Sequence, residues 1–222
     1  MRLIAKNFLT YGASALRGKV AAGFLLLASP VCAADVTVLA LGDSLTQGFG
    51  LPAEEGFVPQ MQDWLQGQGA EVTVINGGVS GDTTSGGAAR IEWSLTDDVD
   101  AIIVALGAND MLRGIDPTIS RANLSKILQV ATEREVRVLL VGLKAPGNFG
   151  PEYKAEFDAI FPDLAAEFGV AHAENFFAGL EGIDATEWPS YFQPDAIHPN
   201  AKGVARIVEA LGPQVMLLTQ SE

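Results

Sequence analysis

Three short runs of almost continuously apolar residues recur along the chain: 36–41 (VTVLAL), 101–106 (AIIVAL) and 136–143 (VRVLLVGL). Each run is too short for a typical helix, and none shows the polar–apolar alternation of a strand with one wet face. Such runs are typical of strands that are buried on both faces, as in parallel sheets covered by helices. The chain therefore favours a sheet enclosed between two other layers.

Helical patterns separate these runs, and two weaker strand-like runs, 72–75 and 170–174, complete the alternation. Strands that alternate with helices predict βαβ units and an α/β fold with a mainly parallel sheet. We expect a three-layer helix–sheet–helix sandwich around five strands. We also expect the last helix to begin at Pro199, because proline is favoured at the first position of a helix. The apolar faces that indicate the helices are Phe57, Met61, Trp64 and Leu65; Ile91 and Leu95; Ile119, Leu124, Ile127, Leu128 and Ala131; Phe157, Ile160, Leu164, Ala165 and Phe168; and Val204, Ile207, Val208 and Leu211.

The first 33 residues differ from the rest of the chain. Residues 1–19 hold four basic and no acidic residues, and residues 20–33 form an apolar run. That run is shorter than the roughly twenty residues that span a bilayer, and it ends in small residues like those that precede a signal cleavage site. We predict a secretory signal peptide over 1–33, cleaved after Ala33 or Ala34, and one domain over 34–222. An uncleaved membrane anchor is the alternative. Cleavage would remove Cys32, the only cysteine of the chain.

The chain is acidic, with 14 basic and 27 acidic residues. Loss of the four basic residues of the leader would bring the net charge from −13 to −17. Such a surface repels nucleic acid and anionic lipid headgroups. The sequence also lacks a G-x-G-x-x-G motif after the first strand run and the lysine of a phosphate-binding loop, which leaves nucleotide binding with little support. We expect no nucleic-acid partner, no cofactor and no metal.

Polar residues follow directly where the apolar runs end. Asp43 and Ser44 follow the first run, and a glycine-rich segment over 76–84 (NGGVSGDTT) follows the second. Asn109 follows the third run, and the segment 195–200 (DAIHPN) precedes the last helical pattern. Because the carboxyl ends of parallel strands lie along one edge of a sheet, we expect these segments to meet there.

The residue types that would meet at this edge are those that acyl transfer requires. Ser44 is a weak nucleophile unless a base lies beside it, and His198 can accept its proton. Asp195 can hold the imidazole in the required tautomer. The backbone N–H groups of Ser44 and Gly81 and the side-chain amide of Asn109 can donate to an oxyanion.

Each of these residues also has an ordinary structural interpretation. Glycine, aspartate and serine are common where a strand passes into a helix, and the aspartate–histidine pair could form a cap or a turn. Gly81 could serve only a backbone conformation with positive φ. We expect Asp43 and Asp82 to cap loops by accepting backbone N–H bonds. His172, the other histidine, lies within a strand-like run and is expected to be structural.

Four blocks in this order resemble those of the SGNH/GDSL hydrolase family: 41–45 (LGDSL), 79–83 (VSGDT), 107–110 (GAND) and 195–198 (DAIH). The resemblance extends from about residue 35 to the C-terminus. It implies that Ser44 is the nucleophile, that Gly81 and Asn109 donate to the oxyanion, and that Asp195 and His198 complete the catalytic set. It also implies a flavodoxin-like sandwich, in agreement with the layers expected from the apolar pattern.

Within that family the chain looks most similar to the group of secreted bacterial acyl-CoA thioesterases I, lysophospholipases and arylesterases. The segment 109–114 (NDMLRG) resembles that group's loop beside the acyl site, and 145–150 (APGNFG) resembles a later loop. The resemblance implies that the substrate loops contain Met111, Leu112, Arg113, Pro146 and Phe149. Met111 stands where the group often has glycine, so the acyl-chain preference stays open.

The sequence therefore predicts a serine esterase, periplasmic or secreted, that hydrolyses carboxylic esters through an acyl-enzyme. Aryl esters, acyl esters, lysophospholipids and thioesters are candidate substrates. Its partner would be a small ester, with no stable membrane insertion after removal of the signal. A carbohydrate O-deacetylase of the same family and an inactive binding module on the same scaffold are the alternatives.

Overall fold

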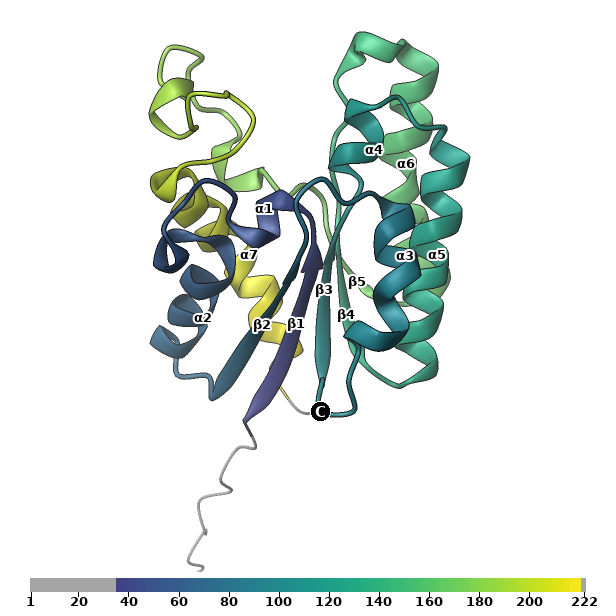
Figure 1. Ribbon diagram of the computed structural model, residues 1–222, viewed down its shortest axis with the longest axis vertical. Helices are drawn as coiled ribbons and strands as arrows, with labels where there is room; N and C mark the ends of the chain where they lie inside the picture. The colour runs from purple at the N-terminus through teal and green to yellow at the C-terminus, as the bar shows by residue number, and fades with distance from the viewer. Residues whose placement is uncertain (1–34, 221–222) are drawn as a thin grey trace, which may run out of the picture. The chain divides into compact units, whose positions relative to one another are not determined.

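Five parallel strands form the centre of the protein (Figure 1). The computed structural model describes residues 35–220, so the predicted signal peptide lies outside the described residues. The strands pair in the order β2-β1-β3-β4-β5, and all four pairings are parallel. Their bounds are β1 (Val36–Gly42), β2 (Val72–Gly78), β3 (Ala101–Ala105), β4 (Arg137–Val141) and β5 (Ala171–Ala173).

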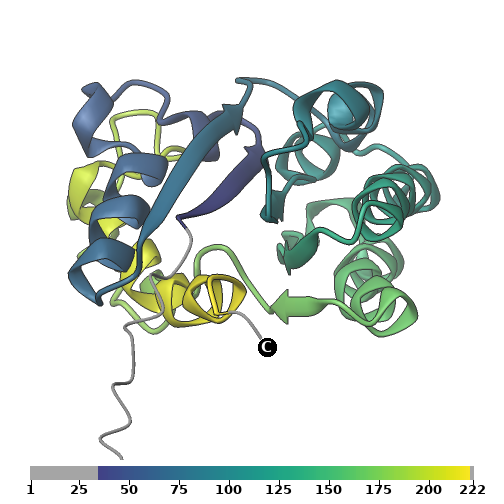
Figure 2. The same ribbon diagram turned by 90° about the horizontal axis from the view of Figure 1, so that it is seen from below.

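Helices cover both faces of this sheet (Figure 2), which confirms the predicted three-layer architecture. One face carries α2 (Phe57–Gly67) and α7 (Ala201–Leu218), and the other carries α3 (Thr84–Ser94), α5 (Pro117–Glu133) and α6 (Pro151–Phe168). The shorter elements are α1 (Ser44–Gln47), α4 (Ala108–Leu112) and the 3₁₀ turns η1 (Ala53–Glu55), η2 (Gly147–Phe149), η3 (Ala178–Leu180) and η4 (Trp188–Ser190). Within residues 35–220, no helix combines enough length with enough apolar character to cross a bilayer.

The apolar runs form the interior of the sheet. Every residue of β3 is buried, and so is all of β1 except Thr37, which is half-buried. Burial on both faces, which the continuous apolar runs predict, is therefore confirmed for these two strands. The edge strand β2 alternates instead, with Val72 and Val74 buried and Thr73 exposed, because α2 packs against one of its faces.

The strand order reverses between β1 and β3. The chain passes from β1 to β2 on one side and then returns to place β3 on the other side of β1. In parallel α/β sheets such a reversal leaves a crevice outside the carboxyl ends of the two strands. The carboxyl ends of β1, β2 and β3 lie at the upper edge of the sheet in Figure 1. The topology thus provides a place for a site at that edge.

The strand that begins at Val72 is longer than predicted. It continues to Gly78, because its last three residues pair in parallel register with Ala40, Leu41 and Gly42 of β1. The glycine-rich segment that we expected to be a loop from residue 76 therefore becomes a loop only from residue 79. The pairing brings the start of this loop level with the end of β1.

The prediction that the last helix begins at Pro199 is wrong. α7 begins at Ala201, and Asn200 is its N-cap. The Asn200 Oδ1 accepts the backbone N–H groups of Lys202 and Gly203 at 3.0 and 3.1 Å. An asparagine cap satisfies donors that the first turn of a helix leaves free, and that role sets the start of α7.

Replacement of Asn200 by alanine is expected to lower the free energy of unfolding by about 1–2 kcal/mol, because the cap bonds are lost. The Asn200 amide also donates to the carbonyls of Ser190 and Phe192, at 2.9 and 3.2 Å, so the segment before the helix should loosen as well. Urea denaturation measures the change. Lys202→Ala, an exposed change in the same helical turn, is the control. Equally small effects of the two substitutions would contradict the capping role.

Candidate active site

Ser44 lies at the carboxyl end of β1, where the chain turns abruptly into α1. Asp43 caps this short helix by accepting the Leu45 N–H at 3.0 Å, which confirms the capping prediction for that residue. Gly42 permits the tight turn, because a Cβ atom at this position would lie 2.7 Å from the Cβ atom of Thr46 in α1 and 2.9 Å from the carbonyl oxygen of Ala105 on β3. The turn presents Ser44 at the edge where the strand order reverses, and there it lines a pocket.

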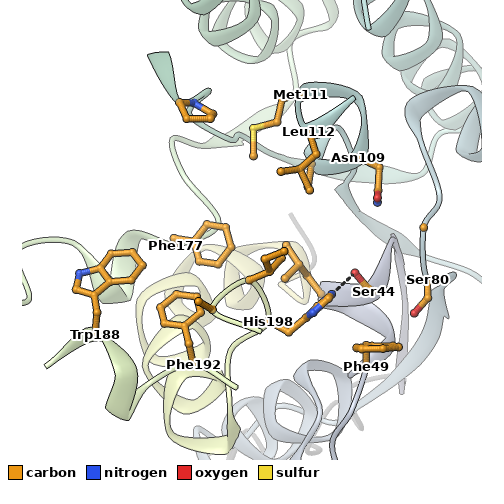
Figure 3. Close-up of a pocket in the computed structure, with 16 residues that line it drawn as sticks. Ser44, Phe49, Ser80, Asn109, Met111, Leu112, Phe177, Trp188, Phe192 and His198 are labelled. Atoms are coloured by element: carbon orange, nitrogen blue, oxygen red, sulfur yellow. Dashed lines mark hydrogen bonds between the residues drawn. The ribbon is translucent and has the colours of Figure 1, made fainter. Parts of the chain in front are cut away.

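Two hydrogen bonds connect Ser44 to His198 and His198 to Asp195. His198 Nε2 lies 2.9 Å from Ser44 Oγ (Figure 3), and His198 Nδ1 lies 2.7 Å from Asp195 Oδ2. Asp195 and His198 belong to one tight turn, in which Ala196 has a φ of +57°. Residues with a side chain rarely adopt this region of backbone conformation. The turn folds Asp195 back beside the imidazole ring.

The Asp195 carboxylate is held by the turn itself. Its Oδ1 accepts the backbone N–H groups of Ile197 and His198, both at 3.0 Å. The bonds from the His198 backbone, the His198 ring and the Ile197 backbone lower the pKa of Asp195 to about 2, because each one stabilises the charged form. The carboxylate therefore stays ionised across the physiological pH range and can accept a hydrogen bond from Nδ1.

Asn109 and Gly81 reach the same pocket from the ends of β3 and β2. Asn109 lies in the first turn of α4, and its Nδ2 donates to the Asp82 carbonyl at 2.9 Å and to Asp43 Oδ2 at 3.3 Å. Gly81 has a φ of +79°, a conformation that favours glycine. The structure thus places together the residues that the sequence singles out for acyl transfer: Ser44, Gly81, Asn109, Asp195 and His198.

The prediction that Asp82 caps a loop is wrong. Its carboxylate pairs with Arg90, whose Nε lies 2.8 Å from Oδ2, and both side chains are almost fully buried. The Arg90 Nη2 also donates to the Gly42 carbonyl at 2.9 Å. An arginine within a helix normally faces solvent, so the sequence pattern did not indicate this inward contact. Arg90 joins the end of β1 to the loop that contains Gly81.

A buried carboxylate fixes α4, the helix that carries Asn109. Asp110 accepts bonds from the Thr84 N–H at 2.9 Å, from the Thr84 hydroxyl, and from the Ser120 hydroxyl at 2.9 Å. Asn123 donates to the same threonine at 3.1 Å. The bonds of Asp110 connect α4 to α3 and α5 and so limit the movement of Asn109.

Asp43 and Asp195 have opposite environments. Asp43 is 1% exposed, and burial raises its pKa from the ordinary value of 3.8 to about 6 despite the bond from the Leu45 N–H and the nearby His198. Burial has this effect because it penalises the ionised form. The two carboxylates beside the Ser44–His198 pair thus have pKa values displaced in opposite directions.

A pocket of about 630 Å³ opens beside Ser44. Its polar side chains, which are Ser44, Ser80, Asn109 and His198, lie toward one end of it (Figure 3), and the rest of the lining is apolar. The apolar lining consists of Leu45, Phe49, Ala108, Met111, Leu112, Pro146, Phe177, Trp188, Phe192, Ala196 and Ile197.

The residues expected in the substrate loops divide into two sets. Met111, Leu112 and Pro146 line the pocket, whereas the structure does not bring Arg113 and Phe149 into the lining. The Arg113 Nη2 donates instead to the Gly81 carbonyl at 2.9 Å. Phe149 packs against Tyr153, with ring centroids 5.2 Å apart.

Nothing in the sequence pattern singled out the aromatic part of the lining. Phe49 and Ile197 are 49% and 50% exposed and lie close in sequence to Ser44 and His198. Their positions could have indicated a role in the pocket, because a large apolar side chain is unusual in a polar loop next to candidate catalytic residues. Phe177, Trp188 and Phe192 come from the segment between β5 and α7, which has no apolar periodicity and offered no signal.

The second histidine lies outside the pocket lining. His172 is half-buried in β5, and burial lowers its pKa, which agrees with the structural role that we expected. Lys144, the cation of the loop after β4, pairs with Glu181 at 3.0 Å. Within residues 35–220, no three histidine, cysteine, aspartate or glutamate side chains are grouped as a metal site would require.

Comparisons with known proteins point to one family. Residues 40–206 match the model of the GDSL-like Lipase/Acylhydrolase family. The chain is 35% identical over 182 residues to "Esterase TesA" of Pseudomonas aeruginosa, which covers 82% of this chain and 88% of that protein. It is 33% identical over 200 residues to "Thioesterase 1/protease 1/lysophospholipase L1" of Escherichia coli K12, with 90% and 92% covered. The solved structure of AlinE4, an SGNH-hydrolase family esterase, has a TM-score of 0.68 and 37% identity, with 84% of this chain and 98% of that one covered.

Because the pKa of Asp43 is raised, its contribution to the free energy of unfolding should fall as the pH rises. Between the ordinary value of 3.8 and about 6, the unfolded chain releases the Asp43 proton more readily than the folded chain. In this interval the folded state binds more protons than the unfolded state. The contribution of Asp43 to the free energy of unfolding is therefore fully present below the interval and is lost as the pH rises through it. The shift corresponds to about 3 kcal/mol in the free energy of unfolding.

Urea titrations between about pH 4 and pH 6 test this linkage when wild type is compared with Asp43→Asn. Asparagine cannot ionise, so the variant should lack this part of the slope, whatever its stability at any one pH. Asp63→Asn, which changes an exposed aspartate on α2, should keep the wild-type slope. An unchanged slope in Asp43→Asn would show that Asp43 is not the group responsible.

Proposed function

Since the chain belongs to the GDSL-like lipase/acylhydrolase family and is a carboxylic ester hydrolase, we propose that it cleaves esters through an acyl-enzyme on Ser44. The observation that carries this proposal is the continuous line of hydrogen bonds from Asp195 through His198 to Ser44, at 2.7 and 2.9 Å. A serine hydroxyl becomes an effective nucleophile when a base lies within hydrogen-bond reach. His198 is in that position.

In the first half of the proposed reaction, Ser44 Oγ attacks the carbonyl carbon of the ester while His198 Nε2 takes the hydroxyl proton. The Asp195 carboxylate accepts the Nδ1–H bond and stabilises the imidazolium. When the tetrahedral intermediate collapses, the bond between the carbonyl carbon and the alcohol oxygen breaks. His198 gives the proton to that oxygen. The alcohol then leaves, and the acyl group stays on Ser44.

In the second half, a water molecule takes the place of the alcohol. It attacks the acyl carbon while His198 accepts its proton, and His198 then returns a proton to Ser44 Oγ as the acyl bond breaks. The products are the carboxylic acid and the free enzyme. One histidine therefore acts as base and as acid in both halves.

The negative charge on the carbonyl oxygen requires donors that are in place before the reaction. We assign this role to the backbone N–H groups of Ser44 and Gly81 and to Asn109 Nδ2. Both hydrogens of Nδ2 have partners, and the bond to Asp43 is longer than the bond to the Asp82 carbonyl, at 3.3 Å against 2.9 Å. The weaker bond is the one that an oxyanion would replace, while the shorter bond keeps the amide oriented.

The pocket supports an apolar ester as the substrate class. A lining that is apolar except at the reacting end favours an alkyl or aryl group, because a buried sugar needs polar partners for its hydroxyl groups. A carbohydrate O-deacetylase is less well supported for this reason. An inactive binding module is disfavoured by the intact line of hydrogen bonds at Ser44. Thioesters and lysophospholipids stay among the candidate substrates, because the name of the Escherichia coli relative includes both activities.

We also propose that the protein acts in the periplasm or outside the cell. The support is the signal-like sequence of residues 1–33, and residues 34–222 contain no cysteine that an oxidising compartment could modify. Sequencing of the mature N-terminus from periplasmic and culture fractions tests this. A start at Ala34 or Asp35 is expected, and a full-length protein confined to the cytosol would contradict the proposal.

Ser44→Ala should abolish both esterase activity and covalent labelling by a fluorophosphonate, with the fold retained. Intact-protein mass spectrometry measures the adduct. Ser80→Ala is the matched control, because the Ser80 hydroxyl lines the same pocket but bonds to Gln47. Labelling should persist in that variant. An adduct on folded Ser44→Ala protein would assign the nucleophile to another residue.

Asn109→Ala should lower kcat on the order of 10²-fold with little change in KM, because an oxyanion donor acts mainly in the transition state. Steady-state kinetics on an aryl ester measures both constants. Asn123→Ala removes one hydrogen bond to Thr84 from the same set of contacts without changing the pocket lining. It should lower the melting temperature and leave kcat near the wild-type value. A raised KM with an unchanged kcat in Asn109→Ala would identify a ground-state contact instead.

A further inference from the structure

An aromatic pair lines the side of the pocket that lies away from Ser44 (Figure 3). The rings of Trp188 and Phe192 stack with their centroids 4.7 Å apart and an interplanar angle of 6°. We propose that Trp188, supported by Phe192, is the end wall of the acyl subsite and sets the longest acyl chain that the enzyme accepts. This proposal rests on the function proposed above.

The Trp188 side chain separates the main pocket from two smaller cavities. One has a volume of about 370 Å³ and shares Trp188, Phe192 and Ala196 with the main pocket. The other has a volume of about 220 Å³ and shares Trp188 and Phe177 with it. Trp188 is the one side chain that borders all three spaces. Loss of its indole ring would therefore join the main pocket to the two smaller pockets.

The wall is anchored to the core through its neighbours. Phe192 is 9% exposed, and its ring lies 6.3 Å from that of Phe177, which in turn lies 5.4 Å from the ring of the buried residue Phe176. Trp188 itself is 41% exposed. A smaller side chain at position 188 therefore removes the outer layer of the wall and leaves the core contacts of Phe192 in place.

We assign the acyl chain to this wall, and the alcohol to the other side, because of the position of His198. His198 must protonate the alcohol oxygen, so the alcohol has to lie beside its ring. The ring next to His198 is that of Phe49, with centroids 4.7 Å apart, and it lies on the side of the pocket away from Trp188 (Figure 3). Phe49 is 49% exposed, so an alcohol that passes over it can leave directly to solvent.

The lining between the reacting end and the wall suits an uncharged hydrocarbon chain. It is formed by apolar side chains such as Leu112, Pro146 and Phe177, within the part of the chain that the structure describes. Each methylene that becomes buried there should raise kcat/KM about fourfold while space remains. A longer chain must displace Trp188 or leave the subsite. A plot of kcat/KM against acyl length should therefore rise up to a certain chain length and stop rising beyond it. We call this length the break.

Hydrolysis of p-nitrophenyl esters from acetate to palmitate, which keeps the alcohol constant, measures this profile. In Trp188→Ala the break should move to longer chains. For the first ester beyond the wild-type break, kcat/KM should rise about tenfold, the effect of one or two additional buried methylenes. The acetate ester does not reach the wall, so its kcat/KM should stay close to the wild-type value. Trp188→Phe keeps a smaller ring and should move the break in the same direction by less.

Two controls separate this role from others. Trp93→Ala changes a tryptophan that is 71% exposed on α3 and does not line the pocket, and it should leave the profile unchanged. A second substrate series keeps the acetyl group and lengthens the alcohol, and Trp188→Ala should leave that series unchanged as well. Melting temperatures show whether each variant is folded. If Trp188→Ala does not fold, Trp188→Phe is used to test the proposal.

Three results would overturn the proposal. These are a break at the wild-type length in the folded Trp188 variants, a change confined to the alcohol series, and an equal fall of kcat/KM at every acyl length. Failure of the proposed function has a different signature: the wild type would hydrolyse none of the esters, and a fluorophosphonate would not label Ser44.

Discussion

The contacts of Arg90 hold the site together. Its guanidinium binds the Gly42 carbonyl at the end of β1 and the Asp82 carboxylate after β2, and the Asp82 carbonyl accepts the amide of Asn109, which follows β3. Three strand ends are thus joined by one line of polar contacts where the strand order reverses. A buried ion pair contributes little net stability, because the loss of hydration offsets the attraction between the charges. Its consequence here is geometric: it fixes the turn at Ser44 relative to the loops beside it.

The two carboxylates near His198 owe their different properties to their surroundings. Asp43 is buried, and its pKa is raised to about 6, whereas the turn around Asp195 supplies N–H donors that lower its pKa to about 2. Carboxylates whose environments displace their pKa values in opposite directions commonly have different roles in one site. In the proposed mechanism Asp195 supports His198 through a charge that persists across the physiological pH range. Asp43 caps α1 and contacts the amide of Asn109.

The pocket combines a polar reacting end with an apolar remainder, and the segment between β5 and α7 contributes to both parts. Ser44, Gly81 and Asn109 follow strand ends that the buried contacts of Arg90 and Asp110 hold in place. Asp195 and His198 lie instead on a tight turn between β5 and α7. Much of the apolar wall comes from the segment between β5 and α7, including Trp188. Loops on a rigid scaffold are the parts that can change without loss of the core. The acyl-length limit proposed for Trp188 is assigned to a side chain outside the Asp195–His198–Ser44 hydrogen bonds, although Trp188 shares a segment with Asp195 and His198.

Continuous apolar runs were enough to predict the buried strands β1 and β3, because a strand that is buried on both faces requires apolar side chains at consecutive positions. The parallel arrangement then predicted that Ser44 and Asn109 would lie at one edge of the sheet, where the structure places them. Other features depend on contacts between distant segments. Only the tertiary structure decided that Arg90 turns inward to pair with Asp82, and that Trp188 lines the same pocket as Ser44. A local pattern records how deeply its own element is buried. It does not predict which side chains from distant parts of the chain come into contact, because those contacts depend on how the segments pack once the chain has folded.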